Sequence, residues 1–326
     1  MNFGVIGIGV MGTNHVRILS EMEEVDSVFV SDLDKEKLDK IRKQYHVERT
    51  YVNYKEMLEK EDLTGVIIAV PSNLHKVVVL DCIEKGVSIL VEKPISNNLE
   101  SAEEMIKKSE KSKGLLTVGH TERFNPIVSK IKELLNDNFL GKIYLINTLR
   151  IGPFPKRLYG TTDGALIDLS VHDTDIIRYL VGDITLVQAK LIFSGSQEIY
   201  AKALFRVDKG VTGSSEFSWV SPKKTRKIEI YGEKGVLEGD YINQELHFYE
   251  NSDIPEDALT KGNISEGKVI KYFISKQEPL KLELKHFIDC IKNNKKSIVS
   301  LGDAKRALEI AIEIYEAGRS NMPAQV

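Results

Sequence analysis

The stretch GIGVMG at residues 7–12 constrains the fold more than any other part of the chain. It has the GxGxxG spacing, follows the apolar run NFGVIGI directly, and opens a stretch with helical character. In a dinucleotide-binding unit the first glycine permits a tight turn, the second lets a pyrophosphate approach the backbone, and the third lets helix and strand pack closely. The first helical turn also offers amide donors and a positive dipole end to a diphosphate. The residues expected to contact a cofactor here are Gly7, Gly9, Val10, Met11 and Gly12.

Asp32 ends the next β-rich run, VFVSD, 20 residues after Gly12. A carboxylate at this place accepts hydrogen bonds from the adenosine ribose hydroxyls, and its charge repels a 2′-phosphate. The next residues are Leu33 and Asp34, so no arginine follows to bind that phosphate. The pattern favours NAD over NADP as the cofactor. The alternative is that Asp32 is a solvated loop acid.

β-rich and helical runs alternate up to about residue 120, and the pattern changes after about residue 140. The first part predicts a doubly wound parallel sheet covered by helices on both faces. The second part, where polar and apolar residues alternate, predicts a mainly antiparallel sheet, with helices at about 164–181, 279–293 and 302–318. We therefore predict an α/β protein with a Rossmann domain at 1–120 and an α+β domain at 121–326. The last helix is a candidate to pack back on the first domain.

The composition indicates which partners to exclude. A net charge of −3 over 326 residues gives no general attraction to nucleic acid or to an anionic membrane. No apolar segment approaches the ~20 residues that span a bilayer, and the first residues lack the basic start of a signal peptide. Cys82 and Cys290 fit small core residues and form no disulfide framework or metal-binding spacing. We expect a cytoplasmic protein without nucleic-acid or membrane partners.

The apolar strand in SILVEKP ends in Glu92, Lys93 and Pro94. Ligands of open parallel sheets bind at the carboxyl ends of the strands, where this strand finishes. A nicotinamide enzyme that oxidises an alcohol needs a group that fixes the substrate oxygen, and the Lys93 ammonium suits that task, with Glu92 to orient it. The alternative is a surface ion pair in a loop, and this stretch by itself does not decide between them.

Asp168 and His172 are four residues apart in DGALIDLSVHDTDIIRYL and share one face of the expected helix. Histidine is the usual proton acceptor near neutral pH, and a carboxylate beside it orients the ring and stabilises its charged form. The alternatives are a His–Asp pair that ties two helices together and an exposed helix face. Two ligands without a clear third predict no metal site. Other candidates at strand ends are Pro71, Asn73, His75, Glu92 and Lys93 for the cofactor and His120 for the substrate.

Together these residues resemble the Gfo/Idh/MocA family of NAD(P)-dependent oxidoreductases. The matching stretches stand in family order over about 175 residues: GIGVMGTNHVR, AVPSNLH, VEKP, GHTERFNP and GALIDLSVHDTD. The resemblance implies that Lys93 is the catalytic lysine and that Asp168 and His172 are the family's Asp-xxx-His pair. It implies hydride transfer between a sugar-like secondary alcohol and nicotinamide, in which His172 takes the hydroxyl proton, assisted by Asp168, while Lys93 holds that oxygen and the nicotinamide. The family's usual TPN is replaced here by Val70, Pro71 and Ser72, followed by Asn73.

The stretch GHTERFNP resembles the form in family members that oxidise nucleotide sugars, notably UDP-N-acetylglucosamine at its 3-hydroxyl. This implies a contact between Arg123 and a substrate phosphate, with the basic loop PFPKRLYG (153–160) near a diphosphate. Alternatively, Arg123 pairs with Glu122 or with a helix end.

Other functions remain open beside this one. The runner-up substrates are a free sugar and myo-inositol. A catalytically silent NAD-binding regulator is the alternative of another class, and the joint presence of Lys93, Asp168 and His172 argues against it. Family members commonly assemble through the open face of the C-terminal sheet, so we expect a homodimer or homotetramer.

Overall fold

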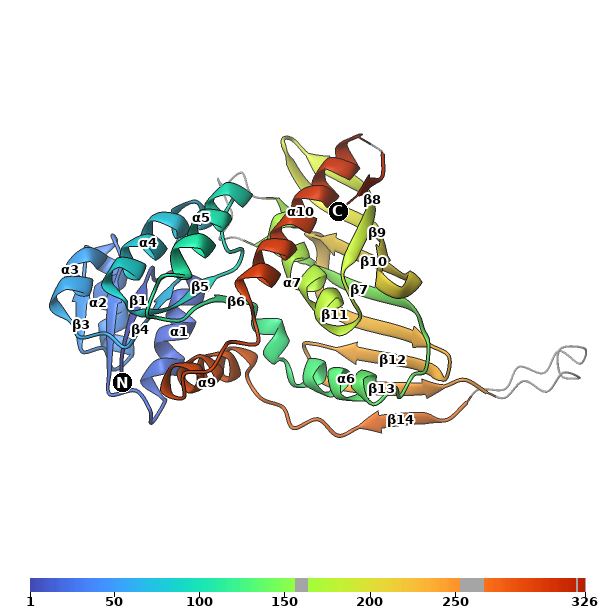
Figure 1. Ribbon diagram of the computed structural model, residues 1–326, viewed down its shortest axis with the longest axis horizontal. Helices are drawn as coiled ribbons and strands as arrows, with labels where there is room; N and C mark the ends of the chain where they lie inside the picture. Colours follow the sequence, from blue (N-terminus) through green and yellow to red (C-terminus); the bar gives the residue numbers. More distant parts are fainter. Residues whose placement is uncertain (156–163, 253–266, 321, 326) are drawn as a thin grey trace, which may run out of the picture. The chain divides into compact units, whose positions relative to one another are not determined.

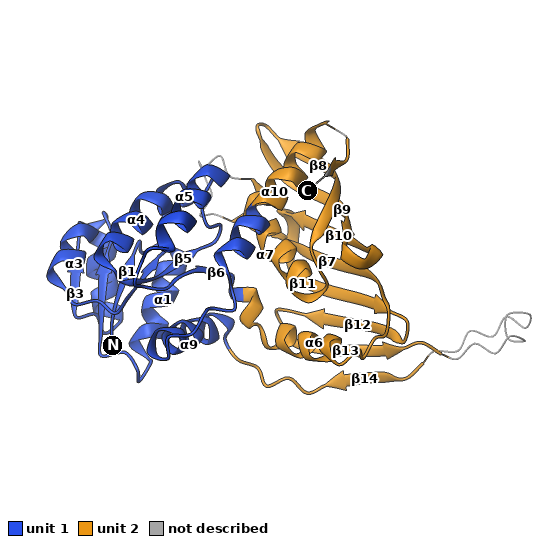
Figure 2. Cartoon of the chain, in the orientation of Figure 1, with its two compact units in different colours: residues 1–121, 278–308 blue, residues 122–277, 309–326 orange. Residues whose placement is uncertain are grey.

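The computed structural model describes residues 1–155, 164–252, 267–320 and 322–325. Internal contacts divide the chain into two compact units, which Figure 2 shows in two colours. Unit 1 comprises residues 1–121 and 278–308, and unit 2 comprises residues 122–277 and 309–326. The sequence analysis assigned residues 278–308 to the second domain, whereas here they cluster with the first unit. The division falls inside helix α10 (Leu301–Ser320).

The sheet of unit 1 has six parallel strands in the order β3-β2-β1-β4-β5-β6, which confirms the predicted doubly wound sheet (Figure 1). Its strands are β1 (Asn2–Ile6), β2 (Ser27–Ser31), β3 (Arg49–Tyr51), β4 (Gly65–Ile68), β5 (Ser88–Glu92) and β6 (Leu116–Gly119). The strand order reverses at β1, which lies between β2 and β4. In open parallel sheets, ligands bind outside the carboxyl ends of the strands at such a reversal.

Helices cover this sheet, which explains why its central strands are apolar along their whole length. They are α1 (Val10–Ser20), α2 (Lys35–Gln44), α3 (Tyr54–Lys60), α4 (His75–Lys85), α5 (Leu99–Ser109) and α9 (Pro279–Lys292). Helix α2 begins where the Asp34 carboxylate accepts hydrogen bonds from the amides of Glu36 and Lys37, at 3.0 and 3.2 Å. The short elements β3 and α3 were not predicted, because three and seven residues hold too little periodicity to be recognised.

Helix α9 completes the core of unit 1, although it follows all the strands of that unit in the chain. Its buried side chains Leu284 and Phe287 belong to the same apolar cluster as Phe3 of β1. The rings of Phe3 and Phe287 lie 6.2 Å apart between centroids. A side chain at Gly65 would collide with Phe3, so this glycine leaves the room that the aromatic pair fills.

The sheet of unit 2 contains nine strands among the described residues, in the order β14-β13-β12-β11-β7-β10-β9-β8-β15. β7 and β10 run parallel, and the neighbours at all other steps are antiparallel, which confirms the predicted mainly antiparallel sheet. The strands are β7 (Ile143–Pro153), β8 (Ile184–Ser194), β9 (Gln197–Val207), β10 (Val211–Ser218), β11 (Val220–Gly232), β12 (Gly235–Asp240), β13 (Glu245–Glu250), β14 (Val269–Tyr272) and β15 (Ala324–Gln325).

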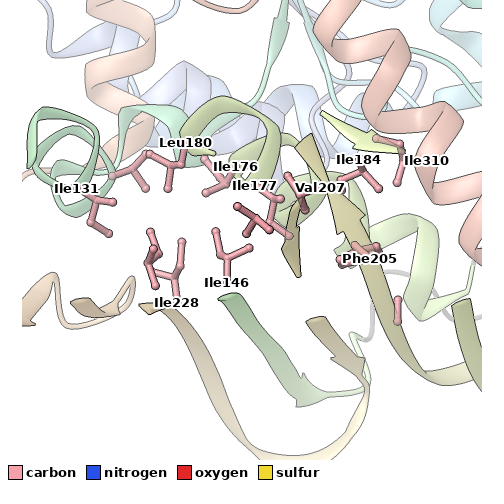
Figure 3. Packing of buried hydrophobic residues seen from close by; sticks show 14 of the residues in the cluster. Ile131, Ile146, Ile176, Ile177, Leu180, Ile184, Phe205, Val207, Ile228 and Ile310 are labelled. Carbon is pink, nitrogen blue, oxygen red and sulfur yellow. The ribbon is translucent and has the colours of Figure 1, made fainter. Parts of the chain in front are cut away.

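Helices α6 (Pro126–Asn136) and α7 (Ala165–Leu180) pack on one face of this sheet. Figure 3 shows the apolar core between these layers, with Ile146 and Ile228 of the strands facing Ile131 of α6 and Ile177 of α7. Helix α6 was not predicted, although its start carries two ordinary signals. Asn125 caps it, and Pro126 occupies the first turn, where a missing amide proton costs nothing. None of the described helices is both long and apolar enough to cross a membrane.

Candidate active site

The glycine motif of unit 1 forms the loop between β1 and α1. Gly7 has φ of +91°, and a Cβ there would lie 2.7 Å from the carbonyl oxygen of Ala69. A Cβ on Gly12 would lie 1.9 Å from the carbonyl oxygen of Gly7, so helix and strand approach more closely than any side chain allows. A Cβ on Gly9 would meet no atom of the described chain within 4 Å. The loop is therefore closed on its protein side and open at Gly9, which fits the approach of a diphosphate.

The N-terminus of α1 follows this opening. Gly9 is the N-cap residue, and the side chains of Val10 and Met11 are 62% and 36% exposed. Exposure of two apolar side chains at a helix start leaves the amides of the first turn accessible, as an anion site requires. This arrangement fits the binding of the cofactor diphosphate.

Asp32 follows β2 directly and is held by two backbone amides. Its carboxylate accepts hydrogen bonds from the Ile8 amide, inside the glycine loop, at 2.6 Å and from the Asp34 amide at 2.9 Å. These contacts fix the carboxylate next to the glycine loop before any ligand binds. Leu33 is 85% exposed beside it. The geometry fits recognition of a ribose next to the diphosphate.

His75 lies at the same sheet edge, but its ring is enclosed by backbone carbonyl groups. The Nε2 atom lies 2.9 Å from the carbonyl oxygen of Val70, and Nδ1 lies 3.0 Å from that of Pro94. Burial lowers the pKa of the imidazole, opposed by these carbonyl groups. His75 therefore ties the loop after β4 to the loop after β5, and this favours a structural role over the predicted contact with the cofactor. Pro71 and Asn73, in contrast, are exposed at the end of β4.

Glu92 and Lys93 stand at the carboxyl end of β5, and the Lys93–Pro94 peptide bond is cis. The Glu92 carboxylate is buried; it lies 2.7 Å from Nε2 of His15 on α1 and accepts a hydrogen bond from the Lys93 amide at 3.3 Å. Burial alone would raise the pKa of Glu92, but the hydrogen bond and charge of His15, together with the Lys93 ammonium, lower it. Glu92 is thus an ionised acid that fixes the backbone at Lys93. The side chain of Lys93 is half-buried.

Sequence reasoning missed two further buried groups of unit 1 near this strand end. His15 of α1 is fully buried, and its Nε2 atom holds the Glu92 carboxylate at 2.7 Å. Glu283 of α9 accepts a hydrogen bond from the Thr121 hydroxyl at 3.1 Å, and burial together with the charge of Glu92 raises its pKa well above its usual value. His120, a predicted substrate residue, is buried directly after β6.

In unit 2, the predicted pair Asp168 and His172 lies on α7, as expected. Both side chains are half-buried, whereas the flanking Leu166, Val171 and Asp173 are buried. The helix begins after Gly164, where a Cβ would collide with the carboxylate of Glu198. The arrangement presents an acid and an imidazole one turn apart on the less buried face of an otherwise buried helix.

Arg123 lies within a buried ion pair of unit 2. Its guanidinium donates to both carboxylate oxygens of Asp175, through Nε at 2.7 Å and Nη2 at 2.5 Å, and its side chain is 3% exposed. It also stacks on the ring of Tyr179, 4.8 Å from the centroid. This bidentate burial favours a structural role for Arg123 over the predicted contact with a substrate phosphate. Residues 156–160 of the basic loop lie outside the described residues.

Arg150 anchors a second buried network, which the sequence did not reveal. It donates to Asp173, through Nε at 2.9 Å and Nη2 at 2.8 Å, and to Glu122 through Nη1 at 2.9 Å. Arg226 of β11 donates to the same Glu122 oxygen at 3.2 Å. Burial would lower the pKa of Arg150, but the two carboxylates raise it above its usual value. The network fixes the part of α7 that carries His172 against β7.

The comparison with family models assigns the chain to a protein family. Residues 1–120 match the model described as the oxidoreductase family with an NAD-binding Rossmann fold, and residues 128–238 match the GFO/IDH/MocA C-terminal domain. The chain belongs to the Gfo/Idh/MocA oxidoreductase family. Membership confirms the predicted resemblance and the prediction of NAD as the cofactor, and it identifies the chain as an enzyme.

Members of the Gfo/Idh/MocA family resemble the chain along its whole length. Myo-inositol 2-dehydrogenase of Thermotoga maritima is 25% identical, covering 94% of this chain and 93% of the relative. The scyllo-inositol 2-dehydrogenase (NAD(+)) of Bacillus subtilis is 29% identical, covering 99% and 95%. The solved structure of UDP-N-acetylglucosamine 3-dehydrogenase from Acidithiobacillus ferrooxidans has a TM-score of 0.84 at 21% identity, covering 98% of both chains. At that identity the structure supports the fold alone.

Replacing Asp32 with alanine is expected to weaken NADH binding by about tenfold to a hundredfold, because hydrogen bonds to a charged group contribute about 1.5–3 kcal/mol. The affinity for NADPH should change much less, because the carboxylate no longer repels its 2′-phosphate. Titration of the NADH and NADPH fluorescence measures both constants. Asp39→Ala, an exposed acid on α2, is the matched control. Equal affinities of the unmodified protein for NADH and NADPH would contradict this role of Asp32.

Proposed function

We propose that this protein is a dehydrogenase that oxidises a secondary hydroxyl group of a sugar or cyclic polyol, with NAD as the hydride acceptor. The observation that carries the proposal is the half-buried Asp168–His172 pair on α7, supported by the buried network of Arg150. A proton acceptor is what alcohol oxidation requires besides the cofactor. The full-length relatives named as inositol dehydrogenases support the same reaction type.

Each residue has a distinct role in the proposed reaction. His172 takes the hydroxyl proton, and Asp168 orients the imidazole and stabilises its charged form. Lys93 binds the same oxygen through its ammonium, and Glu92 holds the Lys93 backbone in place. Bound NAD supplies the acceptor for the hydride. This division of roles rests on the family resemblance and on the chemistry of each residue.

Two substrate classes are in competition. The relatives named myo- and scyllo-inositol 2-dehydrogenase favour an uncharged cyclitol. The GHTERFNP stretch and the relative named UDP-N-acetylglucosamine 3-dehydrogenase favour a nucleotide sugar oxidised at its 3-hydroxyl. The buried pairing of Arg123 with Asp175 removes one reason for the second class, because that arginine no longer supplies a phosphate contact.

A substrate panel tests the proposal and separates the two classes. We expect NADH formation, followed by its absorbance, with at least one member of a set containing myo-inositol, scyllo-inositol, free hexoses, UDP-N-acetylglucosamine and other UDP-sugars. Turnover with free polyols or hexoses alone would reject the nucleotide-sugar class. No turnover with any secondary alcohol of the panel, at saturating NAD, would contradict the proposed reaction.

The cytoplasmic location and the homodimeric or homotetrameric state stay predictions from the sequence. Large apolar side chains on the sheet of unit 2, Tyr144, Ile192 and Leu204, are about half exposed (50%, 52% and 49%), which supports assembly through this sheet.

A further inference from the structure

The layer between α7 and the sheet of unit 2 changes from apolar to charged along two paired strands. On β11, Ile230 and Ile228 are buried in the core, and Arg226 follows them on the same face. On β7, Ile146 and Thr148 are buried and Arg150 follows. The register pairs Ile230 with Ile146 and Arg226 with Arg150. Two arginines thus lie directly opposite each other at one end of the layer.

Like charges directly opposite each other destabilise a sheet, so this pair needs compensation. Asp173 and Glu122 provide it for Arg150, and both arginines share one oxygen of Glu122. Arg150 is 2% exposed and is fully engaged in this network. Arg226, in contrast, is only partly buried, with 30% of its side chain exposed.

Lys224 adds a third cation to this end of the layer. It precedes Arg226 on β11, it is exposed, and a Cβ on Gly152 of β7 would lie 3.7 Å from its Cγ. Within the part of the chain that the structure describes, no carboxylate lies within ion-pair distance of its ammonium. The charge of Arg226, then burial, and then the charge of Arg150 lower the pKa of Lys224, and Glu122 offsets this only in part. The local potential at Lys224 is therefore positive, and an anion there would be stabilised.

This cationic end lies near the proposed proton acceptor. Burial and the charge of Arg150 lower the pKa of Arg226. The charges of Glu122, Asp173 and Asp168 oppose this only in part, and the effect of Asp168 places its carboxylate in the neighbourhood of Arg226. Asp173, which binds Arg150, is the residue next to His172 in α7. The exposed Lys224 and the partly exposed Arg226 thus belong to the same end of unit 2 as the Asp168–His172 pair.

We propose that Lys224 and Arg226 form a subsite that binds a phosphate group of the substrate. The inference rests on the proposed function, because it assigns the charged part of the substrate whose hydroxyl His172 deprotonates. A guanidinium donates to phosphate oxygens in a planar fork, and an ammonium adds a mobile point charge. A diphosphate-linked sugar gains both interactions, whereas an uncharged cyclitol gains neither. The substrate class that the subsite selects is therefore a sugar joined to a phosphate or diphosphate.

Calorimetric titration of UDP into the enzyme saturated with NAD⁺ tests the subsite directly. Saturation with NAD⁺ is needed because the glycine loop of unit 1 also binds diphosphates. We expect UDP to bind the unmodified enzyme, and Lys224→Ala and Arg226→Gln each to weaken this binding about tenfold or more, the effect of one charge-assisted hydrogen bond. Lys223→Ala is the matched control, because this exposed lysine is the immediate neighbour of Lys224, and it should leave UDP binding unchanged.

The outcomes separate this inference from the proposed function. UDP binding that Lys224→Ala weakens supports the subsite even if no alcohol of the panel is oxidised. Turnover of free inositols by an enzyme that binds no UDP overturns the subsite and leaves the dehydrogenase proposal intact. UDP binding that is equally strong in Lys224→Ala, Arg226→Gln and Lys223→Ala also overturns it.

Discussion

Alanine in place of Lys93 or His172 is expected to abolish most turnover while NADH still binds. Loss of a positioned proton acceptor lowers the rate by about 10²- to 10⁴-fold, and we expect His172→Ala to fall in this range. Lys93→Ala removes the group that we propose to hold the reacting oxygen and should lower kcat at least as much. The glycine loop and Asp32 are unchanged in both variants, so the dissociation constant for NADH, measured by fluorescence, should stay close to that of the unmodified enzyme.

Two surface residues provide matched controls for these variants. Lys76 is a partly exposed lysine of unit 1 that pairs with Glu104, and His247 lies on β13 of unit 2. Lys76→Ala and His247→Ala should turn over the best substrate of the panel at the normal rate. Near-normal turnover in either Lys93→Ala or His172→Ala would remove that residue from the proposed scheme.

Methionine in place of Arg150 is expected to lower the free energy of unfolding by about 3–5 kcal/mol, because loss of one partner leaves buried charges uncompensated. Asp173 is 1% exposed and Glu122 is 8% exposed, so neither carboxylate gains water when the guanidinium is lost. Methionine keeps most of the apolar volume, so the effect reports on the charge and not on a cavity. The midpoint of urea unfolding, followed by circular dichroism, measures the change.

The exposed ion pair between Lys271 and Glu245 is the comparison for Arg150. Lys271→Met should change stability by less than about 1 kcal/mol, since surface pairs of this kind contribute little. If Arg150→Met were no more destabilising than Lys271→Met, the buried network would have no part in holding α7 on the sheet.

The features that the sequence predicted well are determined by residues that lie close together in the chain. Gly7, Gly12 and Asp32 stand in a motif whose spacing follows from one strand, one turn and one helix. The structure shows the steric reason at each glycine. Asp168 and His172 share a face because four residues make about one helical turn. Periodicity likewise located α7, α9 and α10 to within a few residues.

The parts that escaped prediction depend on long-range pairing. Arg226 meets Arg150 only through the register of β11 on β7, which no local pattern specifies. Arg123 follows a histidine and precedes a proline in a stretch that looked like a ligand site, yet its partner Asp175 lies 52 residues away. His75 stands at the correct strand end, but its ring orientation depends on the carbonyl group of Pro94. The only sign of the buried network in the sequence was the presence of charged residues such as Arg150 in otherwise apolar strands, since a buried charge needs a partner.

The position of α9 in the chain has a consequence for the order in which the molecule forms. Phe287, Leu284 and Leu280 fill the core of unit 1, yet the ribosome makes them after every strand from β7 to β14. The six strands of unit 1 are therefore synthesised first. Phe287 can pack against Phe3 only after the strands β7 to β14 of unit 2 have also been synthesised. A gene fragment that encodes the glycine loop and all six parallel strands would still lack α9, which contributes part of the apolar core of unit 1. In this enzyme the cofactor-binding module is contiguous in space and not in the gene.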